Sequence, residues 1–276
     1  MQEGGQRVAG AWAGVDTPEE PLVSVITIVL NGAAYLEQTI QSVLGQTYKN
    51  IEYIIVDGGS EDGTLDIVRR YEEHLAYWIS EPDGGLFYAM NKGMGLATGS
   101  VIGMVNSDDW YAPDAVEAAV RAIDGHDVVC GNICRVYTNF EVVVRPRFDR
   151  RRRRCFCPHP AVFVRAEVYR SKLFDTRYAV AGDIEFFLDL YLRLGVQFRC
   201  IDQVLTCMRA GGWSGQHRLR GYKELLGIRA RFGDWRGVAQ IVWKLSKFLA
   251  ARTVRYVGGP RFYDALRKRV RERISL

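Results

Sequence analysis

Two adjacent carboxylates, Asp108 and Asp109, stand in the stretch NSDDW directly after the apolar run SVIGMV. Like charges at the end of a buried strand repel each other, so the pair needs either a positive partner or a capping role at the next helix. Carboxylate oxygens are hard ligands, and Mg²⁺ or Mn²⁺ is commonly held by one or two of them together with substrate phosphates. The pair therefore predicts a divalent-cation site, with helix capping before Pro113 as the structural alternative.

Three more apolar runs end in polar or acidic residues. SVITIVL is followed by Asn31, IEYIIV by Asp57, and YWIS by a loop that contains Asp83. Ligands of open α/β sheets bind beyond the carboxyl ends of the strands. A turn or a helix cap explains one acidic strand end, but four polar strand ends that converge on one edge indicate a binding site.

The elements that must position these residues alternate between strands and helices. Four short apolar runs rich in β-branched residues predict strands over 24–30, 51–56, 77–80 and 100–105. Stretches with helical apolar spacing lie between them. The alternation predicts an α/β fold with a mostly parallel, Rossmann-like sheet flanked by helices. No G-x-G-x-x-G follows a strand and no G-x-x-x-x-G-K-[ST] occurs, which argues against a dinucleotide site and against a P-loop.

Beyond residue 115 the pattern changes. Residues 127–147 predict short strands that could pair as a hairpin, 161–164 a further strand, and 182–195 an amphipathic helix. Two strand-like runs follow, VQFRCI and VLTCMR, and from about residue 218 the pattern is helical to the end. We therefore expect a second half with a different architecture and a helical extension after it.

The charge is distributed unevenly along the chain. Residues 1–140 carry 7 basic and 20 acidic side chains, a balance of −13, whereas residues 141–276 carry 30 basic and 12 acidic ones, a balance of +18. An acidic half suits a cation, and a basic half suits phosphates or an anionic surface. The five successive arginines Arg150–Arg154 fit either a diphosphate contact or a solvated loop.

The cysteines and the chain start bear on the compartment. None of the six cysteines forms a C-x-x-C pair, and Cys155 and Cys157 are too close in sequence for the usual zinc knuckle. We therefore expect reduced thiols in a cytoplasmic protein. Residues 1–20 lack the apolar run of a signal peptide and are expected to form a flexible leader. No run of 18 apolar residues predicts a membrane-spanning helix.

Two long stretches carry a family resemblance. PLVSVITIVLNGAAYLEQTIQSVLGQTYKNIEYIIVDGGSEDGT and SEPDGGLFYAMNKGMGLATGSVIGMVNSDDW resemble family 2 glycosyltransferases, whose nucleotide-sugar-binding domain has the GT-A fold. Five motifs occur in the family's order and spacing over residues 21–115, and EPDxGxxxAMNKG followed by xNSDD resembles the subgroup that builds bacterial surface polysaccharides. The resemblance implies a GT-A domain over 21–217, with a nucleotide-binding half to residue 115 and an acceptor half over 116–217. A basic helical extension over 218–276 follows.

The resemblance implies nucleotide contacts at the strand ends. Asp57 would bind the base, Asp108 would face the ribose or a metal-bound water, and the end of the first strand would form the floor of the nucleoside pocket. Leu30 stands where family members often carry an aromatic residue. The residues implied to contact the nucleotide are Thr27, Val29, Asn31, Asp57, Asp83, Lys92 and Asp108.

The resemblance also implies cation ligands and a catalytic base. Asp109 would bind Mn²⁺ or Mg²⁺ directly, with Asp108 beside it and His217 as a third ligand. Asp183 matches the aspartate that takes a proton from the acceptor hydroxyl, and a helix N-terminus stabilises its ionised form. Its structural alternative is an ordinary helix N-cap. The residues implied to contact the acceptor or the donor sugar are Glu185, which is also the alternative base, His159, Trp213 and Asn106. For His159 and His217 a structural role is an equal alternative.

These observations predict a metal-dependent, inverting glycosyltransferase. It would move a sugar from a nucleotide sugar, with a UDP-sugar favoured, to a hydroxyl of a glycan or of a polyprenyl-linked acceptor. Residues 218–276 carry 16 basic and 4 acidic side chains, which predicts binding to an anionic membrane at the inner face of the plasma membrane. Packing of these helices on the catalytic domain is the alternative. A nucleic-acid-binding protein would explain the basic half but not the acidic strand ends, and a non-catalytic sugar-nucleotide scaffold would not need the full set of aspartates.

Overall fold

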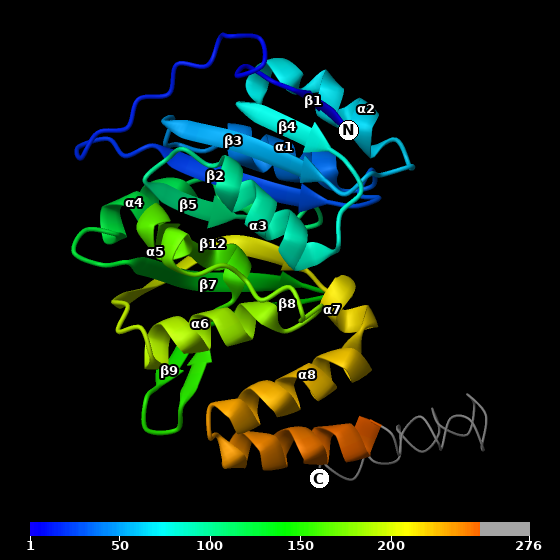
Figure 1. Cartoon of the computed structure of the whole chain (residues 1–276), viewed down its shortest axis with the longest axis vertical. Helices are drawn as coiled ribbons and strands as arrows, with labels where there is room; N and C mark the ends of the chain where they lie inside the picture. The colour runs from blue at the N-terminus through cyan, green and yellow to red at the C-terminus, as the bar shows by residue number, and fades with distance from the viewer. Residues whose placement is uncertain (249–276) are drawn as a thin grey trace. The chain divides into compact units, whose positions relative to one another are not determined.

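The computed structural model describes residues 1–248, which belong to two compact units (Figure 1). The first unit comprises residues 1–216 and contains all the strands described. The second unit begins at His217 and is helical in its described part.

The centre of the first unit is a sheet with the strand order β1-β4-β3-β2-β5-β11-β7-β12-β6. Four of its strands, β2 (Val23–Val29), β3 (Ile51–Asp57), β4 (Tyr77–Ser80) and β5 (Val101–Met104), pair in parallel. Every residue of β2 is buried, because helices cover both faces of this group. The strands predicted in the first half are confirmed, and in Figure 1 the arrows of β2, β3 and β4 point the same way.

Helices cover the two faces of the parallel strands. The core on one face joins side chains of β2 and β3 to those of α1 (Leu36–Leu44), α2 (Thr64–Arg70) and α4 (Ala115–Ala122). On the other face lies α3 (Leu86–Leu96), where a Cβ at Gly93 would come within 2.5 Å of Ile26. Helix and strand therefore approach closely because this position is glycine. The α/β class and the helix-flanked parallel strands are confirmed.

Beyond β5 the sheet becomes mixed. β11 (Val162–Arg165) is antiparallel to both β5 and β7 (Val128–Val136), and β12 (Phe198–Arg209) runs parallel to β7. The predicted hairpin exists, since β8 (Glu141–Val144) pairs antiparallel with β7. The two runs VQFRCI and VLTCMR form one strand, β12, interrupted by register shifts rather than by a turn.

Shorter elements complete the first unit. They are the strand β6 (Trp110–Tyr111), which pairs with β12, the 3-10 helices η1 (Glu72–His74) and η2 (His159–Ala161), and the helices α5 (Ala166–Ser171), α6 (Gly182–Leu192) and α7 (Trp213–Gln216).

The arginine run forms the turn of a separate two-stranded sheet, β9 (Arg147–Asp149) with β10 (Arg154–Phe156). Phe148 of this hairpin packs against Tyr191 near the end of α6, with ring centroids 5.2 Å apart. Arg150 lies over the same tyrosine ring, 5.5 Å from its centroid. The hairpin therefore sits near the carboxyl end of α6, about 12 Å along the helix from Asp183 in its first turn.

The chain start differs from the expected flexible leader. Residues 2–4 form β1 (Gln2–Gly4), which pairs antiparallel with β4. The guanidinium of Arg7 then forms an ion pair with Glu52, a fully buried carboxylate that also accepts a hydrogen bond from Ser24 Oγ. A buried charge requires such partners. The ion pair with Glu52 therefore holds the segment around Arg7 in place.

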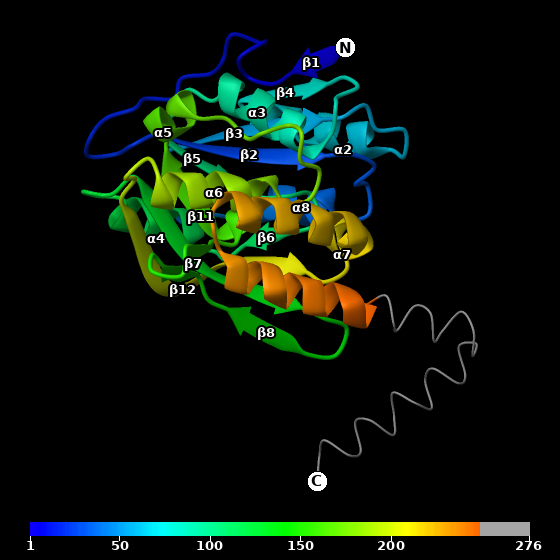
Figure 2. The same ribbon diagram turned by 60° about the horizontal axis from the view of Figure 1, so that its bottom comes forward.

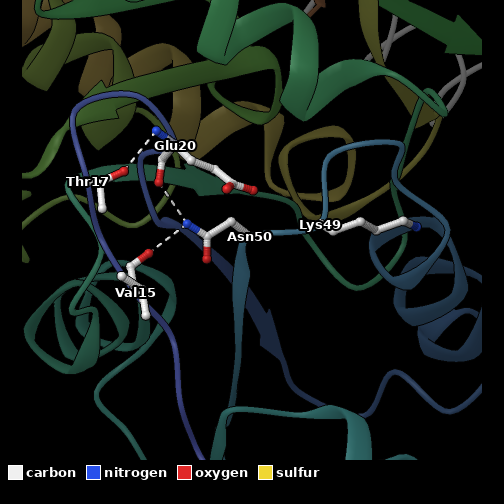
Figure 3. A pocket seen from close by; sticks show the side chains of 5 residues that line it. All are labelled: Val15, Thr17, Glu20, Lys49 and Asn50. Carbon is white, nitrogen blue, oxygen red and sulfur yellow. Dashed lines mark hydrogen bonds between the residues drawn. The ribbon is translucent and has the colours of Figure 1, made fainter.

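A shallow pocket lies at the amino end of β3, and Figure 3 shows its five lining residues. The Asn50 Nδ2 group donates to the carbonyl oxygens of Val15 at 2.7 Å and Glu20 at 2.8 Å. These polar groups therefore satisfy one another, and the pocket lies at the opposite end of β3 from Asp57.

The expectation of reduced thiols was wrong for two cysteines. Cys130, on β7, and Cys157, just before η2, form a disulfide with Cα atoms 6.5 Å apart. The distance suits a disulfide because the chain returns to the sheet beside β7 before entering β11. Cys134, Cys200 and Cys207 are free thiols.

In the second unit, α8 (Arg218–Arg231) is followed by a helix over 235–248 (Figure 2). Trp235, Val242 and Trp243 on this second helix are 68%, 50% and 57% exposed. Leu249, Arg252 and Arg255, which also motivated the predicted membrane contact, lie outside the described residues. Within residues 1–248 no helix has the length and apolarity to cross a bilayer.

Candidate active site

The loops that follow β2, β3, β4 and β5 meet at one edge of the sheet, as expected for parallel strands. A Cβ at Gly58 would lie 2.9 Å from Asp83 Oδ2, so the loops after β3 and β4 are in contact. A Cβ at Gly32 would lie 3.1 Å from Ser107 Oγ, so the loops after β2 and β5 are also in contact. The predicted convergence of the polar strand ends is therefore present.

Asp57 is buried, with 1% of its surface exposed, and its carboxylate organises the loop after β3. Oδ2 accepts hydrogen bonds from the backbone N–H groups of Gly59 and Ser60 and from Ser80 Oγ, at 3.1, 3.0 and 2.6 Å. Oδ1 accepts one from Ser60 Oγ at 2.5 Å. These bonds hold the loop in place, and the contact of Asp57 with a base stays a prediction.

The end of β2 contributes Asn31 rather than the side chains before it. Thr27 bonds Tyr53 inside the core at 3.0 Å, and Val29, the last residue of β2, is also buried in the core. Asn31 adopts a left-handed φ of 51°, and its Oδ1 accepts a hydrogen bond from Glu61 N at 2.9 Å. Leu30 is 57% exposed and lies beside Gly58. An exposed apolar side chain thus stands at the position of the missing aromatic residue.

Asp83 and Lys92 lie on the segment that runs from the loop after β4 into α3, and each has a hydrogen-bond partner within that segment. Asp83 Oδ1 accepts a hydrogen bond from Gly85 N at 2.7 Å, which shapes the turn before α3. Lys92, one and a half turns into α3, donates to Glu81 Oε1 at 2.7 Å, and this hydrogen bond lowers the pKa of Glu81. The ammonium group therefore lies next to the loop after β4.

The two adjacent carboxylates have different surroundings. Asp109 is 1% exposed, and its Oδ1 accepts a hydrogen bond from the backbone N–H of Arg209 at 3.0 Å. Burial, and then the neighbouring charge of Asp108, raise the pKa of Asp109 to about 8. Asp108 is only half-buried, and burial raises its pKa as well. Asp108 is therefore the more accessible carboxylate, whereas Asp109 is linked to β12.

Asn106 adds an oxygen to this cluster. Its Nδ2 group lies 3.4 Å from Asp109 Oδ2, and its buried Oδ1 has no hydrogen-bond partner among the described residues. An unpaired buried oxygen is costly unless a ligand or a water completes it. Asn106 Oδ1 is therefore an oxygen that a water or a ligand could complete.

The segment after β12 joins the two halves of the site. A Cβ at Gly212 would lie 2.7 Å from Asp108 Oδ2, and the indole N–H of Trp213 donates to the carbonyl oxygen of Ala179 at 3.0 Å. Ala179 is four residues before Asp183. One short segment therefore contacts both the acidic pair and the chain that leads into α6.

Arg209 was not predicted as a site residue. Its guanidinium lies over the rings of Tyr35 and Trp110, 4.2 and 5.1 Å from their centroids, and donates to Gln38 Oε1 at 2.6 Å. Arg209 lies a hundred positions from Asp109 in sequence, and neither it nor its surroundings match a motif. Only the contacts of β12 identify this arginine as part of the acidic cluster.

Asp183 is the second residue of α6, and the N-cap position belongs to Ala181. The ordinary N-cap interpretation of Asp183 is therefore wrong. A Cβ at Gly182 would lie 2.7 Å from the Phe87 ring of α3, so the start of α6 adjoins the helix that follows Asp83. The start of α6, which carries the half-buried Asp183, thus adjoins α3, and Ala179 just before it contacts Trp213.

The alternative base, Glu185, is 1% exposed and lies inside the fold. Its Oε2 is 3.5 Å from Lys172 Nζ, and Lys172 also contacts Asp189 at 2.9 Å. This ion-pair network ties α6 to the segment after α5. Glu185 is therefore better placed to fix the helix than to take a proton from a substrate.

The two histidines differ in placement. His159 begins η2, which contacts β5, β7 and β12; its buried Nε2 has no hydrogen-bond partner among the described residues. Burial lowers the pKa of His159 to about 4, so the imidazole is neutral near pH 7. His217 belongs to the second unit, at the N-cap of α8, and its role as a cation ligand stays a prediction.

Comparison with known proteins identifies the chemistry. A mycobacterial protein named PGL/p-HBAD biosynthesis glycosyltransferase, from Mycobacterium bovis, is 34% identical over 180 residues, which cover 60% of this chain and 68% of that protein. An uncharacterized glycosyltransferase of Mycobacterium tuberculosis is 44% identical over 107 residues, 38% of this chain and 41% of its own length. The match thus spans about two fifths of that relative.

Solved structures support the fold. A mannosyltransferase from Pyrobaculum calidifontis, in complex with GDP-Man and Mn²⁺, aligns with a TM-score of 0.62 at 17% identity and covers 94% of this chain and 82% of its own. S. aureus TarS in complex with UDP-GlcNAc aligns with a TM-score of 0.61 at 18% identity, covering 80% and 71%. The profile of the family described as Glycosyl transferase family 2 matches residues 24–183, which include the four strand ends and Asp183. The chain belongs to the family 2 glycosyltransferases.

Proposed function

We propose that this glycosyltransferase moves a sugar from a nucleotide sugar, with a UDP-sugar as the favoured donor, to a hydroxyl of a glycan or lipid-linked acceptor in surface-polysaccharide synthesis. We propose further that it needs Mn²⁺ or Mg²⁺ and inverts the anomeric centre. One observation carries the proposal. The segment after β12 touches Asp108 through Gly212 and the chain leading to Asp183 through Trp213, which supports one site that contains the proposed cation ligand and the proposed base.

Asn106 and Asp108 fit a divalent cation, because both offer hard oxygens and Asn106 Oδ1 lacks another partner among the described residues. Within residues 1–248 no three His, Cys, Asp or Glu side chains gather closely enough to hold a metal by themselves. The proposal therefore assigns the remaining ligands to phosphate oxygens of the donor. The cation would offset the charge that develops on the departing nucleoside diphosphate.

This assignment shifts the direct contact from Asp109, expected from the resemblance, to Asp108. Asp109 is buried and already accepts a hydrogen bond from Arg209 N. Its burial and that bond support a role behind Asp108, as a residue that positions the loop after β5. In this proposal Asp108 binds the cation directly, and Asp109 holds the loop that carries Asp108.

Asp183 is proposed as the base. The backbone N–H groups of the first turn of α6 stabilise its ionised form. The acceptor hydroxyl would transfer its proton to Asp183 while its oxygen bonds to the anomeric carbon, from the side opposite the departing diphosphate. A single displacement of this kind inverts the configuration at that carbon, which is the reason for proposing inversion.

The names of similar proteins support a nucleotide sugar as the donor. The structural neighbours bind UDP-GlcNAc or GDP-Man, one of them with Mn²⁺, and the mycobacterial relatives are named for PGL/p-HBAD biosynthesis. These statements apply to those proteins. For this chain they define which nucleotide sugars to test first.

A binding and hydrolysis screen tests the proposal. UDP-, GDP- and dTDP-sugars are added with Mn²⁺, with Mg²⁺ or with EDTA, and thermal stabilisation and release of nucleoside diphosphate are measured. We expect at least one nucleotide sugar to stabilise the protein only when the cation is present. Failure of every nucleotide sugar to bind would refute the donor assignment.

We also propose that the second unit binds an anionic membrane at the cytoplasmic face. The support is its excess of basic residues and the exposed Trp235, Val242 and Trp243 on one helix. Co-sedimentation with vesicles rich in phosphatidylglycerol tests this, with phosphatidylcholine vesicles as the control. Equal sedimentation with both kinds of vesicle, or with neither, would refute it.

A further inference from the structure

The turn between β7 and β8, residues 137–140, exposes two aromatic rings. Tyr137 is 37% exposed and Phe140 is 60% exposed. Their rings stack with centroids 4.5 Å apart and an angle of 15° between the planes. The backbone bond from Tyr137 N to Phe140 O, 2.9 Å long, closes the turn and fixes this arrangement. Exposed apolar surface of this kind, held in one geometry, is typical of a binding surface.

This aromatic pair lies near the candidate active site. Val136, directly before Tyr137, accepts a hydrogen bond from Ala210 N at 2.9 Å, and Gly212 two residues later adjoins Asp108. Because a residue spans at most about 3.6 Å, the backbone of Tyr137 lies within about 20 Å of that carboxylate. In Figures 1 and 2 the turn is on the side of the sheet toward which β2 points.

The nucleotide site does not use this turn. The loops after β2, β3, β4 and β5 hold their polar groups among themselves and with Arg209, and none of their hydrogen bonds involves Tyr137 or Phe140 among the described residues. The turn instead belongs to β7 and β8, in the half of the sheet beyond β11. A ligand that spans the site and this turn would therefore be longer than the donor sugar alone.

We propose that Tyr137 and Phe140 form a stacking platform for a sugar ring of the acceptor. The inference rests on the proposed function and adds the acceptor class, a glycan of at least two sugars. One face of a pyranose carries C–H groups that pack against an aromatic ring, and Thr138 and Asn139 in the same exposed turn offer partners for its hydroxyls. A purely lipid ligand would leave these two polar side chains without a role.

Substitutions at Phe140 separate stacking from general apolar contact. Phe140→Tyr keeps the ring, and Phe140→Leu keeps an apolar side chain without it. Phe156→Leu is the matched control, because Phe156 is likewise an exposed phenylalanine, at 37%, but lies on β10 in the separate hairpin. Val143→Thr, at a 46% exposed position of β8, tests the apolar strand beside the turn.

Saturation-transfer NMR titrations measure binding of methyl glycosides and disaccharides of glucose, galactose, mannose, rhamnose and N-acetylglucosamine. We expect a disaccharide to bind the wild type, about 10-fold weaker binding for Phe140→Leu, and binding within about twofold of wild type for Phe140→Tyr, Phe156→Leu and Val143→Thr. Hydrolysis of the nucleotide sugar without acceptor should be the same in all variants.

Three results would overturn the platform. They are equal binding by Phe140→Leu and wild type, an equal loss in Val143→Thr, and a panel in which no sugar binds the wild type. The proposed function fails separately, when the wild type binds no nucleotide sugar. If the protein binds the donor and Phe140→Leu leaves sugar binding unchanged, only the platform is refuted.

Discussion

The two halves of the sheet build their functional edges in different ways. After β3 and β4, the acidic residues accept hydrogen bonds mainly from their own loops, as Asp57 does from Gly59 and Ser60, and Asp83 from Gly85. After β12, the contacts join distant parts of the chain, such as Arg209 with Asp109 and Trp213 with Ala179. Contacts within loops thus shape the proposed nucleotide side, whereas long-range contacts assemble the proposed catalytic and acceptor side.

The largest effect on activity is expected for Asp183, the proposed base. Asp183→Asn should lower kcat by about 10²–10⁴-fold, because the acceptor hydroxyl loses its proton acceptor, while donor binding is unchanged. Steady-state kinetics and a donor titration measure the two quantities. Glu185→Gln is the comparison, and it should affect stability more than donor or acceptor chemistry. Wild-type kcat in Asp183→Asn together with a large loss in Glu185→Gln would show that the wrong carboxylate was assigned.

Asp108 and Asp109 differ in burial and in hydrogen-bond partners, so substitutions at the two positions should lower activity by different amounts. Asp108→Asn should lower cation-dependent turnover by about 10²–10³-fold, because it removes a direct ligand. Asp109→Asn should cost about 10–100-fold, the range of residues that orient a ligand from behind. Initial rates over a Mn²⁺ titration measure both. A larger loss in Asp109→Asn than in Asp108→Asn would reverse the assignment in favour of the sequence expectation.

The buried His159 should make the free energy of unfolding depend on pH. Its folded-state pKa of about 4 lies below the unfolded value of 6.5, so the unfolded state binds the proton more tightly. The contribution of the neutral imidazole is fully present above pH 6.5 and is lost as the pH falls toward 4. The loss should be about 2–3 kcal/mol in the free energy of unfolding.

Urea unfolding of wild type and His159→Gln at pH 7, 6, 5 and 4 measures this dependence. The variant should have a shallower slope between pH 6.5 and 4, and His74→Gln, at an exposed position, is the control. Identical slopes for wild type and His159→Gln would show that the buried imidazole does not set the pH dependence.

A smaller effect is expected at Arg209. Replacing it by Ala removes the guanidinium between Tyr35 and Trp110 and its bond to Gln38, which should lower the free energy of unfolding by about 1–2 kcal/mol. Arg121→Ala is the matched control, because the Arg121 side chain is 76% exposed and, within residues 1–248, pairs only with Glu117 on the same helix. That change should remain within about 0.5 kcal/mol. Equal effects in the two variants would mean that Arg209 adds nothing beyond a surface ion pair.

The contrast between the halves also explains what the sequence could predict. β2, β3, β4 and β5 follow from apolar runs with β-branched residues, and the convergence of Asn31, Asp57, Asp83 and Asp108 follows from the rule for parallel strands. These signals are local, as are several of the hydrogen bonds that shape the loops after β3 and β4. The resemblance to family 2 glycosyltransferases rests on the same segment.

The features that escaped prediction depend on contacts between distant residues. The different burial of Asp108 and Asp109 results from Gly212 and Arg209, about a hundred positions away. The disulfide of Cys130 and Cys157 depends on the return of the chain beside β7, and β1 depends on a carboxylate at residue 52 that receives Arg7. No local pattern carries this information, because it arises only when segments distant in the sequence come together in the fold.

The most direct test of the central claim is calorimetric titration of UDP into wild type and Asp108→Asn, each with Mn²⁺ and with EDTA. The proposed site predicts that wild type binds UDP with Mn²⁺, and that EDTA or Asp108→Asn weakens this binding at least about 10-fold. GDP and dTDP, titrated in the same way, identify the base preferred. Nucleotide binding of equal strength in all four conditions would contradict a cation-dependent site at Asp108.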